Sequence, residues 1–494
     1  MADEKPSEGS RGGFLSKFTV MKGSAPELWL TFALKFLNIA AYGLTNVTIS
    51  LWLSTEFGFS DKGALALVLA WSITMTSVTL LVGSLTDALG LRRTFFVGAG
   101  VCLFARLMMV FATNKWLAVV GGLFPLAVGE ALGSPVLVAA VRQYSTPLQR
   151  SISFSLVYMV MNLAFLVNGY VFDGVRSGLG EHGHWTLPGL GLTLPTYRVL
   201  FLVSSGLQLV MFPLIWLMRS GVEVTEEGVE IRPPLPTRAS GGMFQALGAT
   251  VVSAARDTGR LFAALFQQRS FYRLLGFLAL IACLKVILQV LYYVFPKFGI
   301  RELGPGAPVG KLMSINSWLV IFLVPVVGAL TQRFRAYGMT ILGSALTVGS
   351  VFIMALPTEW FQSMAAGPFG QWLGHSYLGL PGDVHPYYVM IALFITVFSF
   401  GEAFYSPRVY EYAASIAPKG QEASYAALSY VPMLLGKVLT SAVAGFLLER
   451  YCPETGPRHS ATMWLIVALI ATVAPVGLIA LSKVIRVREA GRED

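Results

Sequence analysis

The chain has 494 residues, of which 55% are hydrophobic and only 13% are charged, and its mean hydropathy is +0.66. Soluble proteins carry about 25% charged residues, so these values exclude a soluble globular domain, whose surface would have too little polar cover. The net charge of +10 could indicate nucleic-acid binding, but the basic residues lie in short segments between apolar stretches, as in the inner loops of membrane proteins.

Apolar stretches of about 20 residues, long enough to cross a bilayer, recur along the chain between Gly, Pro and charged residues. They predict twelve transmembrane helices, near residues 28–54, 62–87, 93–113, 115–142, 150–173, 196–219, 271–296, 308–332, 336–356, 386–413, 421–450 and 459–486. Lys and Arg gather in every second loop, so we expect a multi-pass protein of the cell (inner) membrane with both termini cytoplasmic.

A long loop divides the predicted helices into two sets of six. We expect a cytoplasmic tail at 1–27, a first bundle at 28–219, a cytoplasmic linker at 220–270, a second bundle at 271–486 and a cytoplasmic tail at 487–494. Within the loop, residues 221–240 read as a flexible linker. Residues 243–266 place apolar side chains at alternating spacings of three and four, which predicts an amphipathic helix on the inner membrane surface.

The two halves repeat each other. Segment 82–98 matches 327–343, and GEALGSP at 129–135 matches GEAFYSP at 401–407. Parallel six-helix repeats related by an axis along the membrane normal are typical of one transporter architecture. The predicted fold class is therefore an all-α membrane protein with about twelve transmembrane helices in two pseudo-symmetric six-helix bundles.

One motif lies between the second and third predicted helices. It reads Gly83-x-Leu85-x-Asp87-x-x-Gly90-x-Arg92-Arg93. It resembles the signature loop of the major facilitator superfamily, in which the Asp and the basic pair form contacts that latch the outward-open state. The resemblance implies a gating role for these residues. Gln332 occupies the place of Asp87 in the second half, so we expect that latch to be weaker or absent there.

Ionisable residues inside the predicted helices form the main candidate site, because each costs a few kcal/mol to bury unless it faces a cavity or a partner. Those nearest mid-depth are Glu130, Glu402, Lys285 and Lys437. The two carboxylates fall at matching depth in the repeat. They indicate a polar central cavity for substrate binding or proton coupling, and structural ion pairs are the alternative. We interpret Lys35 and Arg106 as structural.

Neutral polar groups extend this set of candidates. They are Tyr42, Asn46, Asn162 and Gln289. Tyr42 and Asn46 lie one turn apart, as do Lys285 and Gln289, so each pair shares a helix face. The histidines lie in predicted outer loops, and the three cysteines lack metal-ligand spacing. We find no phosphate loop and no catalytic constellation, so we expect no enzyme activity, no metal site and no cofactor beyond a proton gradient that could drive transport.

Three stretches resemble the proton-dependent oligopeptide transporter (POT/PTR) family. They are Phe154-Ser155-x-x-Tyr158-x-x-x-Asn162, Gly401-Glu402-x-x-x-Ser406-Pro407, and Phe298-Gly299 through Asn316 and Pro325. The resemblance implies that Glu402 helps to couple protons and binds a peptide amino terminus. The family motif Glu-x-x-Glu-Arg-Phe-x-Tyr-Tyr-Gly of helix 1 is replaced by Leu34-x-x-Leu37-Asn38-Ile39-x-Ala41-Tyr42-Gly43, and Ser134 stands where the family has Lys. The chain is thus similar to a divergent member.

These features predict a monomeric secondary active transporter, embedded in the lipid bilayer without nucleic acid. We expect it to move a small organic solute, peptide-like, zwitterionic or amphiphilic, by rocker-switch alternating access, with proton coupling through Glu402 and Glu130. The alternatives are an uncoupled facilitator or an exporter of drugs or lysolipids, and a non-transporting receptor or scaffold on a transporter fold. A membrane enzyme ranks last.

Overall fold

The computed structural model describes residues 21–485 apart from 190, 226–227, 232–251, 253–255, 257–265, 332–333 and 417–430. Eleven helices in this part of the chain are long and apolar enough to cross a membrane. The helix α17 stands in the place of the eleventh predicted span, 421–450, of which the first ten residues lie outside the described ones. The predicted all-α membrane fold is therefore confirmed.

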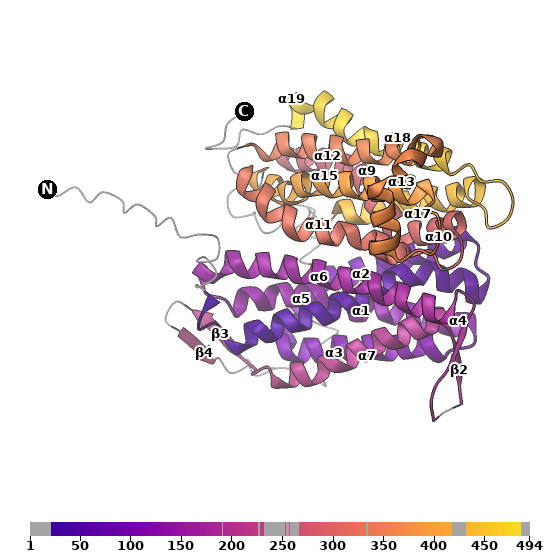
Figure 1. Ribbon diagram of the computed structural model, residues 1–494. Coiled ribbons are helices and arrows are strands. Elements are labelled where there is room, and N and C mark those ends of the chain that lie inside the picture. Colours follow the sequence, from indigo (N-terminus) through magenta and orange to yellow (C-terminus); the bar gives the residue numbers. More distant parts are fainter. Residues whose placement is uncertain are drawn as a thin grey trace.

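The first half of the chain folds as one bundle, drawn in indigo to magenta in Figure 1. Its elements are α1 (Pro26–Phe57), α2 (Asp61–Leu89), α3 (Leu91–Phe111), α4 (Lys115–Ala118), the π-helical turn η2 (Val119–Leu123), α5 (Phe124–Gln143), α6 (Pro147–Leu179), the strands β1 (His184–Thr186) and β2 (Thr193–Pro195), and α7 (Thr196–Leu217). The predicted helix 115–142 thus consists of α4, η2 and α5 in succession.

The second half forms the other bundle, in orange to yellow. After the strands β3 (Val222–Thr225) and β4 (Gly228–Ile231) come α9 (Arg269–Tyr293), α10 (Phe295–Leu303), α11 (Val309–Leu330), α12 (Ala336–Ile353), η3 (Thr358–Phe361), α13 (Gln362–Ala366), α14 (Pro368–Gln371), η4 (Trp372–Leu378), α15 (Pro386–Ile416), α17 (Val431–Tyr451), α18 (Ser460–Ala480) and α19 (Ser482–Ile485).

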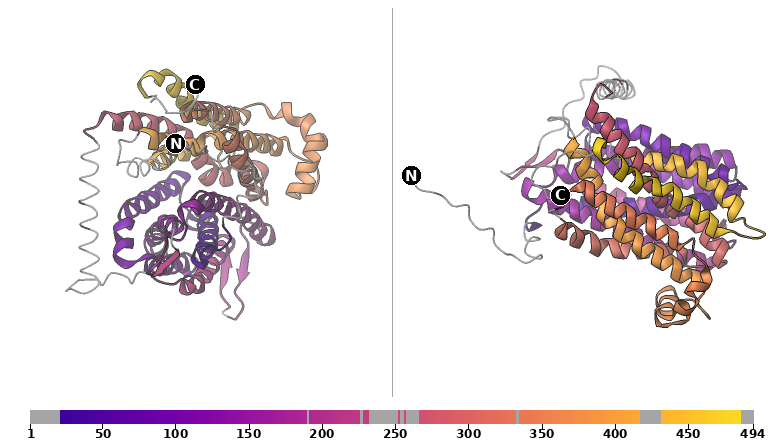
Figure 2. Two further views of the ribbon diagram at one scale, coloured as in Figure 1. Left: turned by 90° about the vertical axis from the view of Figure 1, so that its left-hand side faces the viewer. Right: turned by 90° about the horizontal axis from the view of Figure 1, so that it is seen from above.

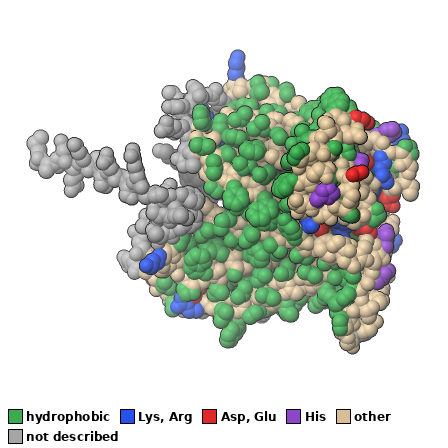
Figure 3. All heavy atoms as spheres, in the orientation of Figure 1, with side chains coloured by type: hydrophobic (Ala, Val, Ile, Leu, Met, Phe, Trp, Pro, Cys, Tyr) green, Lys and Arg blue, Asp and Glu red, His purple; other side chains and the backbone are tan. Residues whose placement is uncertain are grey.

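Helix α1 begins and helix α19 ends at the same end of the two bundles, on the left of Figure 1. We call this the terminal end, where α1 begins and α19 finishes. We call the opposite end the distal end, and it carries the β1–β2 hairpin and the connections after α1, α10 and α17. Figure 3 shows hydrophobic side chains over the middle of the molecule and charged and histidine side chains gathered at the distal end, as expected for a protein that spans a bilayer.

Local signals set where the helices begin and end. The Ser60 side chain caps α2 by accepting the Gly63 N–H at 3.1 Å. Thr146 and Gln149 form a capping box at the start of α6, where Pro is the first helical residue. Gly58, with φ +67°, ends α1 in the left-handed conformation that glycine adopts without strain.

The two bundles repeat the same packing. In the first, α1 packs on α6 and α7, and α3 packs on α5 and α7. In the second, α9 packs on α17 and α18, and α12 packs on α15 and α18. Across the interface, α6 packs on α11 and α2 packs on α17. Figure 2 shows the bundles side by side, viewed along and across their axes. This pattern is the pseudo-two-fold arrangement predicted from the internal repeat.

Matched glycines bring matched helices together within each bundle. A Cβ atom on Gly129 of α5 would lie 3.0 Å from the carbonyl oxygen of Gly98 on α3. In the second bundle, a Cβ atom on Gly401 of α15 would lie 2.7 Å from the carbonyl oxygen of Gly343 on α12. Each close approach needs small residues. Each also fixes the position of the glutamate that follows, Glu130 or Glu402.

Two regions expected to be irregular contain secondary structure. Residues 221–240 were predicted as a flexible linker, but β3 and β4 pair antiparallel, with Val222 opposite Ile231. The alternating apolar residues of VEVTEEGVEI explain this strand pair. The predicted loop 357–385 contains η3, α13, α14 and η4, which project beside the second bundle in Figure 2. Pro and Gly residues break this segment into short helical turns.

Several predicted segments fall outside the described residues. These are the first 20 residues of the tail 1–27, nearly all of the predicted amphipathic helix 243–266, and the tail 487–494. The domain limits at 27, 219, 270 and 486 stay predictions.

Candidate substrate-binding site

Glu402 of α15 faces the neighbouring helix α11. Its carboxylate accepts a hydrogen bond from the Asn316 side-chain amide at 3.0 Å, and the same amide group donates to Ser399 at 3.0 Å. Glu402 is 8% exposed. It has no ion-pair partner among the residues that the structure describes. The glutamate is thus held by neutral groups.

Lys285 of α9 lies on the same side of the second bundle. Its ammonium group donates to the Tyr405 hydroxyl at 3.2 Å and lies 4.8 Å from the centre of the Tyr405 ring. Tyr405 follows Glu402 by three residues, so one face of α15 carries both the carboxylate and the lysine's partner. The charges of Lys285 and Glu402 interact electrostatically without forming an ion pair.

Lys437 of α17 sits at the interface between the bundles. Its ammonium group lies over two aromatic rings, 5.5 Å from the centre of Trp71 on α2 and 5.7 Å from that of Tyr293 on α9. Such cation–π contacts stabilise a desolvated ammonium group but leave its charge uncompensated. No carboxylate of the described part of the chain pairs with it. Lys437 can therefore attract an anionic group.

The polar residues predicted on α1 join this aromatic group. Tyr42 stacks on Trp71 with ring centres 6.0 Å apart. Asn46 accepts a hydrogen bond of 3.5 Å from the Tyr293 hydroxyl. Tyr42, Asn46 and Lys437 were predicted separately from the sequence, and the structure places them around the same two rings. We call Lys437, Trp71, Tyr293, Tyr42 and Asn46 the aromatic box.

Glu130 has different surroundings from those of Glu402. Its carboxylate pairs with Arg106 of α3 at 2.5 Å, and the Asn38 amide donates to it at 3.4 Å. Arg106 also donates to Gln208 of α7 at 2.8 Å, and both members of the ion pair are almost fully buried. This network joins α1, α3, α5 and α7 inside the first bundle, which agrees with the structural interpretation of Arg106.

Two further residues of the predicted site, Asn162 and Gln289, differ in their hydrogen bonding. Asn162 donates to the Tyr158 carbonyl of its own helix at 2.9 Å. Gln289 is buried one turn after Lys285, and its side chain forms no hydrogen bond with another described residue. Gln289 therefore keeps a side-chain amide without a described partner, whereas the Asn162 amide bonds to its own helix backbone.

Cross-bundle contacts close the distal end. Asp173 of α6 accepts hydrogen bonds from the Gly310 and Lys311 backbone N–H groups at 3.0 and 2.6 Å, so a carboxylate of the first bundle caps helix α11 of the second. Arg176 donates to the Ala307 carbonyl at 3.1 Å and pairs with Asp173 and Glu181. These contacts join α6 to the start of α11.

Charged groups on α2 and α10 complete the closure. Asp61 of α2 pairs with Lys297 at 2.7 Å and with Arg301 at 2.8 Å. Burial lowers the pKa of Lys297, and the Asp61 charge opposes that shift. Burial alone would raise the pKa of Glu181, but hydrogen bonds from Arg176 and Tyr197 hold it below its usual value.

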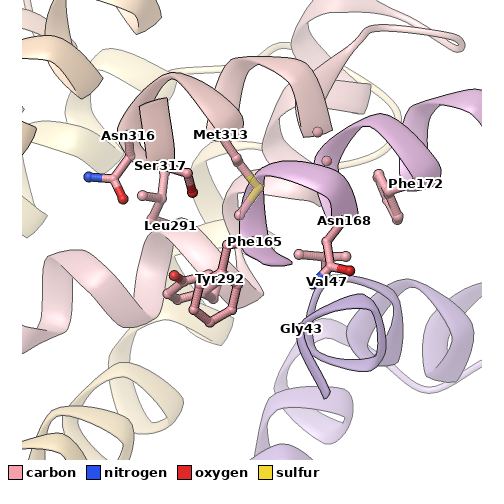
Figure 4. A pocket seen from close by; sticks show the side chains of 12 residues that line it. Gly43, Val47, Phe165, Asn168, Phe172, Leu291, Tyr292, Met313, Asn316 and Ser317 are labelled. Atoms are coloured by element: carbon pink, nitrogen blue, oxygen red, sulfur yellow. The ribbon is translucent and has the colours of Figure 1, made fainter. Parts of the chain in front are cut away.

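A small cavity remains between the closed distal contacts and Glu402. It measures about 30 Å³, a water-sized space, and is lined by residues of α1, α6, α9 and α11. Figure 4 shows Asn168 and Tyr292 on opposite sides of it and Asn316 at its edge. Asn316 also donates to Glu402, so one side chain of the cavity lining contacts the carboxylate. It is too small for an organic solute.

The predicted gating motif lies at the terminal end. Gly83 and Asp87 belong to the last turns of α2, and the Asp87 side chain lies outside the described ones. Gly90, with φ +80°, connects α2 to α3. Arg92 donates to the Trp216 carbonyl of α7 at 2.8 Å, whereas Arg93 is exposed. The gating role of the motif stays a prediction.

Three aromatic residues of the site were missed by the sequence reasoning: Trp71, Tyr293 and Tyr405. For the two tyrosines a signal existed. Tyr293 follows Lys285 and Gln289 at successive intervals of four on α9, so all three share a face. Tyr405 lies inside the repeated GEAFYSP segment. Trp71 carried no such signal, because its role depends on the contact between α2 and α17.

The family model of the Major Facilitator Superfamily matches residues 31–370. The chain belongs to this superfamily, and it is a multi-pass membrane transporter of that fold. No curated protein sequence matches the chain.

Solved structures show the same fold. A peptide transporter, POT, in complex with sulfate is 15% identical, with 96% of each chain covered and a TM-score of 0.67. A POT family transporter in complex with 5-aminolevulinic acid is 12% identical, with 93% of this chain and 96% of that chain covered and a TM-score of 0.66. The nucleoside transporter NupG is 13% identical, with 93% and 100% covered and a TM-score of 0.64.

Proposed function

We propose that the chain is a secondary transporter for a small organic solute that carries an anionic group together with a cationic group. One observation carries this proposal: Lys437, Lys285 and Glu402 bring charges of both signs to the region where the bundles meet, and none of them has an ion-pair partner among the described residues. Buried charges without partners are costly unless a ligand or a proton compensates them.

The roles of these residues follow from their surroundings. The Lys437 ammonium in the aromatic box attracts the anionic group of the solute. The Glu402 carboxylate, held by Asn316, attracts the cationic group or carries a proton when the solute is absent. One of the transporters with this fold is described in complex with 5-aminolevulinic acid, which has both an amine and a carboxylate. A zwitterion of this kind supports the proposed charge pattern.

Transport would proceed by alternating access. The contacts of Asp173, Arg176 and Asp61 join the bundles at the distal end. We propose that the site opens to the terminal end in this state. The terminal end carries most of the basic loops, and we propose that it faces the cytoplasm. Breaking the distal contacts and closing the terminal end would expose the site to the other side.

A second candidate function is an uncoupled facilitator or exporter. The sequence of α1 favours this candidate. Leu34 and Leu37 stand where the peptide transporter family that this chain resembles has carboxylates. This part of a proton path then has no titratable group. Solute movement that ignores a pH gradient would favour this candidate.

The test is thermal unfolding of the purified chain against dipeptides, single amino acids, nucleosides and lysophospholipids, because a ligand of the folded state raises the unfolding midpoint. We expect stabilisation by a compound with both charges. Lys437→Met should weaken its affinity by about tenfold, since a charge-assisted contact is lost. Lys62→Gln, which removes an exposed ammonium, serves as the matched control. Stabilisation by nucleosides alone would contradict the proposed charge pattern, and stabilisation by none would favour the receptor or scaffold.

A further inference from the structure

A second pocket lies at the terminal end, outside the proposed solute site. It has a volume of about 300 Å³. The loop between α2 and α3, the end of α5 and the stretch after α7 line it. It lies entirely within the first bundle, at the level where the membrane-spanning part of α3 begins with Leu91. The pocket therefore lies at the membrane surface.

The charged side chains that line the pocket are all basic. Arg92, Arg93 and Arg219 all border the pocket. Arg219 pairs with Glu27 at 2.5 Å, whereas Arg92 donates to the neutral Trp216 carbonyl, so that one of the three charges is compensated by a described carboxylate. The side chain of Asp87, one turn before Gly90, lies outside the described ones. Clustered guanidinium groups favour an anion with several oxygens.

The backbone adds donors to the same pocket. Gly90 precedes α3, a helix of 21 residues, and Leu91, Arg92 and Arg93 form its first turn. The first N–H groups of a helix have no acceptor within the helix and carry the positive end of its dipole. A phosphate group suits this combination of N–H groups and arginines.

Tyr144 supplies an independent observation. Its side chain lines the pocket at the end of α5 and is 2% exposed, yet its hydroxyl has no hydrogen-bond partner among the described residues. Burial raises the pKa of Tyr144 to about 12, so the hydroxyl stays a donor. The side chain lines the pocket, and a bound oxygen acceptor there could take a hydrogen bond from this hydroxyl.

We propose that this pocket binds a phosphate group, carried by the headgroup of an anionic phospholipid of the leaflet at the terminal end. Trp216 and Leu217, at the end of α7 beside the pocket, are 68% and 57% exposed. These apolar side chains offer a surface for acyl chains next to the arginines, and Trp is typical of the headgroup level. The position at the membrane surface therefore favours a lipid over a soluble phosphate.

The test uses the full chain in an uncharged detergent and measures its thermal unfolding against dioctanoyl phosphatidic acid. We expect a saturable rise of the unfolding midpoint, which does not depend on any transported solute. Arg93→Gln should weaken the apparent affinity by about tenfold, because one charge-assisted contact is lost. Tyr144→Phe keeps the packing of the ring and should weaken the affinity by a few-fold. Inorganic phosphate at the same concentration should have little effect.

Arg142→Gln is the matched control, because Arg142 is an exposed arginine on the last turn of α5 that does not line the pocket. This variant should bind the lipid as the unchanged chain does. Equal losses for Arg142→Gln and Arg93→Gln would show diffuse attraction and overturn the site. If inorganic phosphate stabilised the chain equally and displaced the lipid, the pocket would be a phosphate site, but the proposal that a lipid carries the phosphate would be wrong. No saturable stabilisation by either compound would overturn the proposal.

Discussion

Glu130 and Glu402 occupy matched positions in the two bundles, but their surroundings differ. Each follows a glycine that packs closely on a neighbouring helix, α3 for Glu130 and α12 for Glu402, so both lie at the same depth. Glu130 forms a buried ion pair with Arg106, whereas Glu402 is held by the neutral amide of Asn316. The internal repeat determines where a carboxylate lies, and the facing helix determines whether its charge is available.

The different partners of Glu130 and Glu402 indicate different roles for the two glutamates. A buried ion pair that is broken on one side leaves an uncompensated charge, so Glu130 and Arg106 are suited to hold α5 and α3 together. A carboxylate held by a neutral partner has no opposite charge to lose when it binds another group, which suits Glu402 to a transport cycle. We propose that Glu130 stabilises the fold and that Glu402 acts on the solute or the proton.

The largest expected effect is on stability. Glu130→Gln should lower the free energy of unfolding by about 3 to 5 kcal/mol, because the charge of Arg106 stays buried without its partner. Thermal or denaturant unfolding of the purified chain measures this loss. The double variant Glu130→Gln with Arg106→Met should recover part of it. Unchanged stability of Glu130→Gln would remove the structural role.

Glu402→Gln should leave stability within about 1 kcal/mol, since glutamine can keep a hydrogen bond to Asn316. It should abolish solute accumulation driven by a pH gradient in liposomes and weaken solute exchange without a gradient, because the contact with the cationic group of the solute is lost. Uptake of the solute found by the ligand panel measures both quantities. Full gradient-driven accumulation by Glu402→Gln would exclude this residue from coupling.

The distal closure should respond to acid. The pKa of Glu181 is lowered in the closed state, so its ionised carboxylate stabilises the closed distal end. This stabilisation is fully present above the usual carboxyl pKa of about 4.3, and it is lost as the pH falls through the lowered pKa. Spin labels on Ser177→Cys and Pro305→Cys, which are exposed on the two sides, should move apart at acid pH. The response should disappear in Glu181→Gln. An equal response in that variant would assign it to another group.

The smallest effect is expected at the surface. Lys62 and Glu449 form an ion pair of 3.1 Å between the bundles, and the Lys62 side chain is 56% exposed. Exposed pairs contribute about 0 to 1 kcal/mol, so Lys62→Gln should change the unfolding free energy by no more than that. If Lys62→Gln lowered the free energy of unfolding as much as Glu130→Gln, solvent exposure would not explain the different strengths of the two ion pairs.

Much of the fold could be predicted from the sequence because apolar length and the internal repeat are local signals. The depth of Glu130 and Glu402 followed from the same repeat. The partners could not be predicted, since Arg106 and Asn316 lie far from their glutamates in the chain and meet them only through helix packing. The aromatic box needed the contact between α2 and α17, for which Trp71 gives no sign in the sequence. The β3–β4 pair was missed although its residues alternate.

The most direct test of the division between the bundles compares Glu130→Gln and Glu402→Gln in one thermal unfolding experiment, with and without a stabilising zwitterion. We predict that Glu130→Gln unfolds at a lower temperature but is still stabilised by the ligand. Glu402→Gln should unfold at the temperature of the unchanged chain and lose most of the ligand's effect. The reverse result, with ligand response lost in Glu130→Gln and kept in Glu402→Gln, would contradict the account.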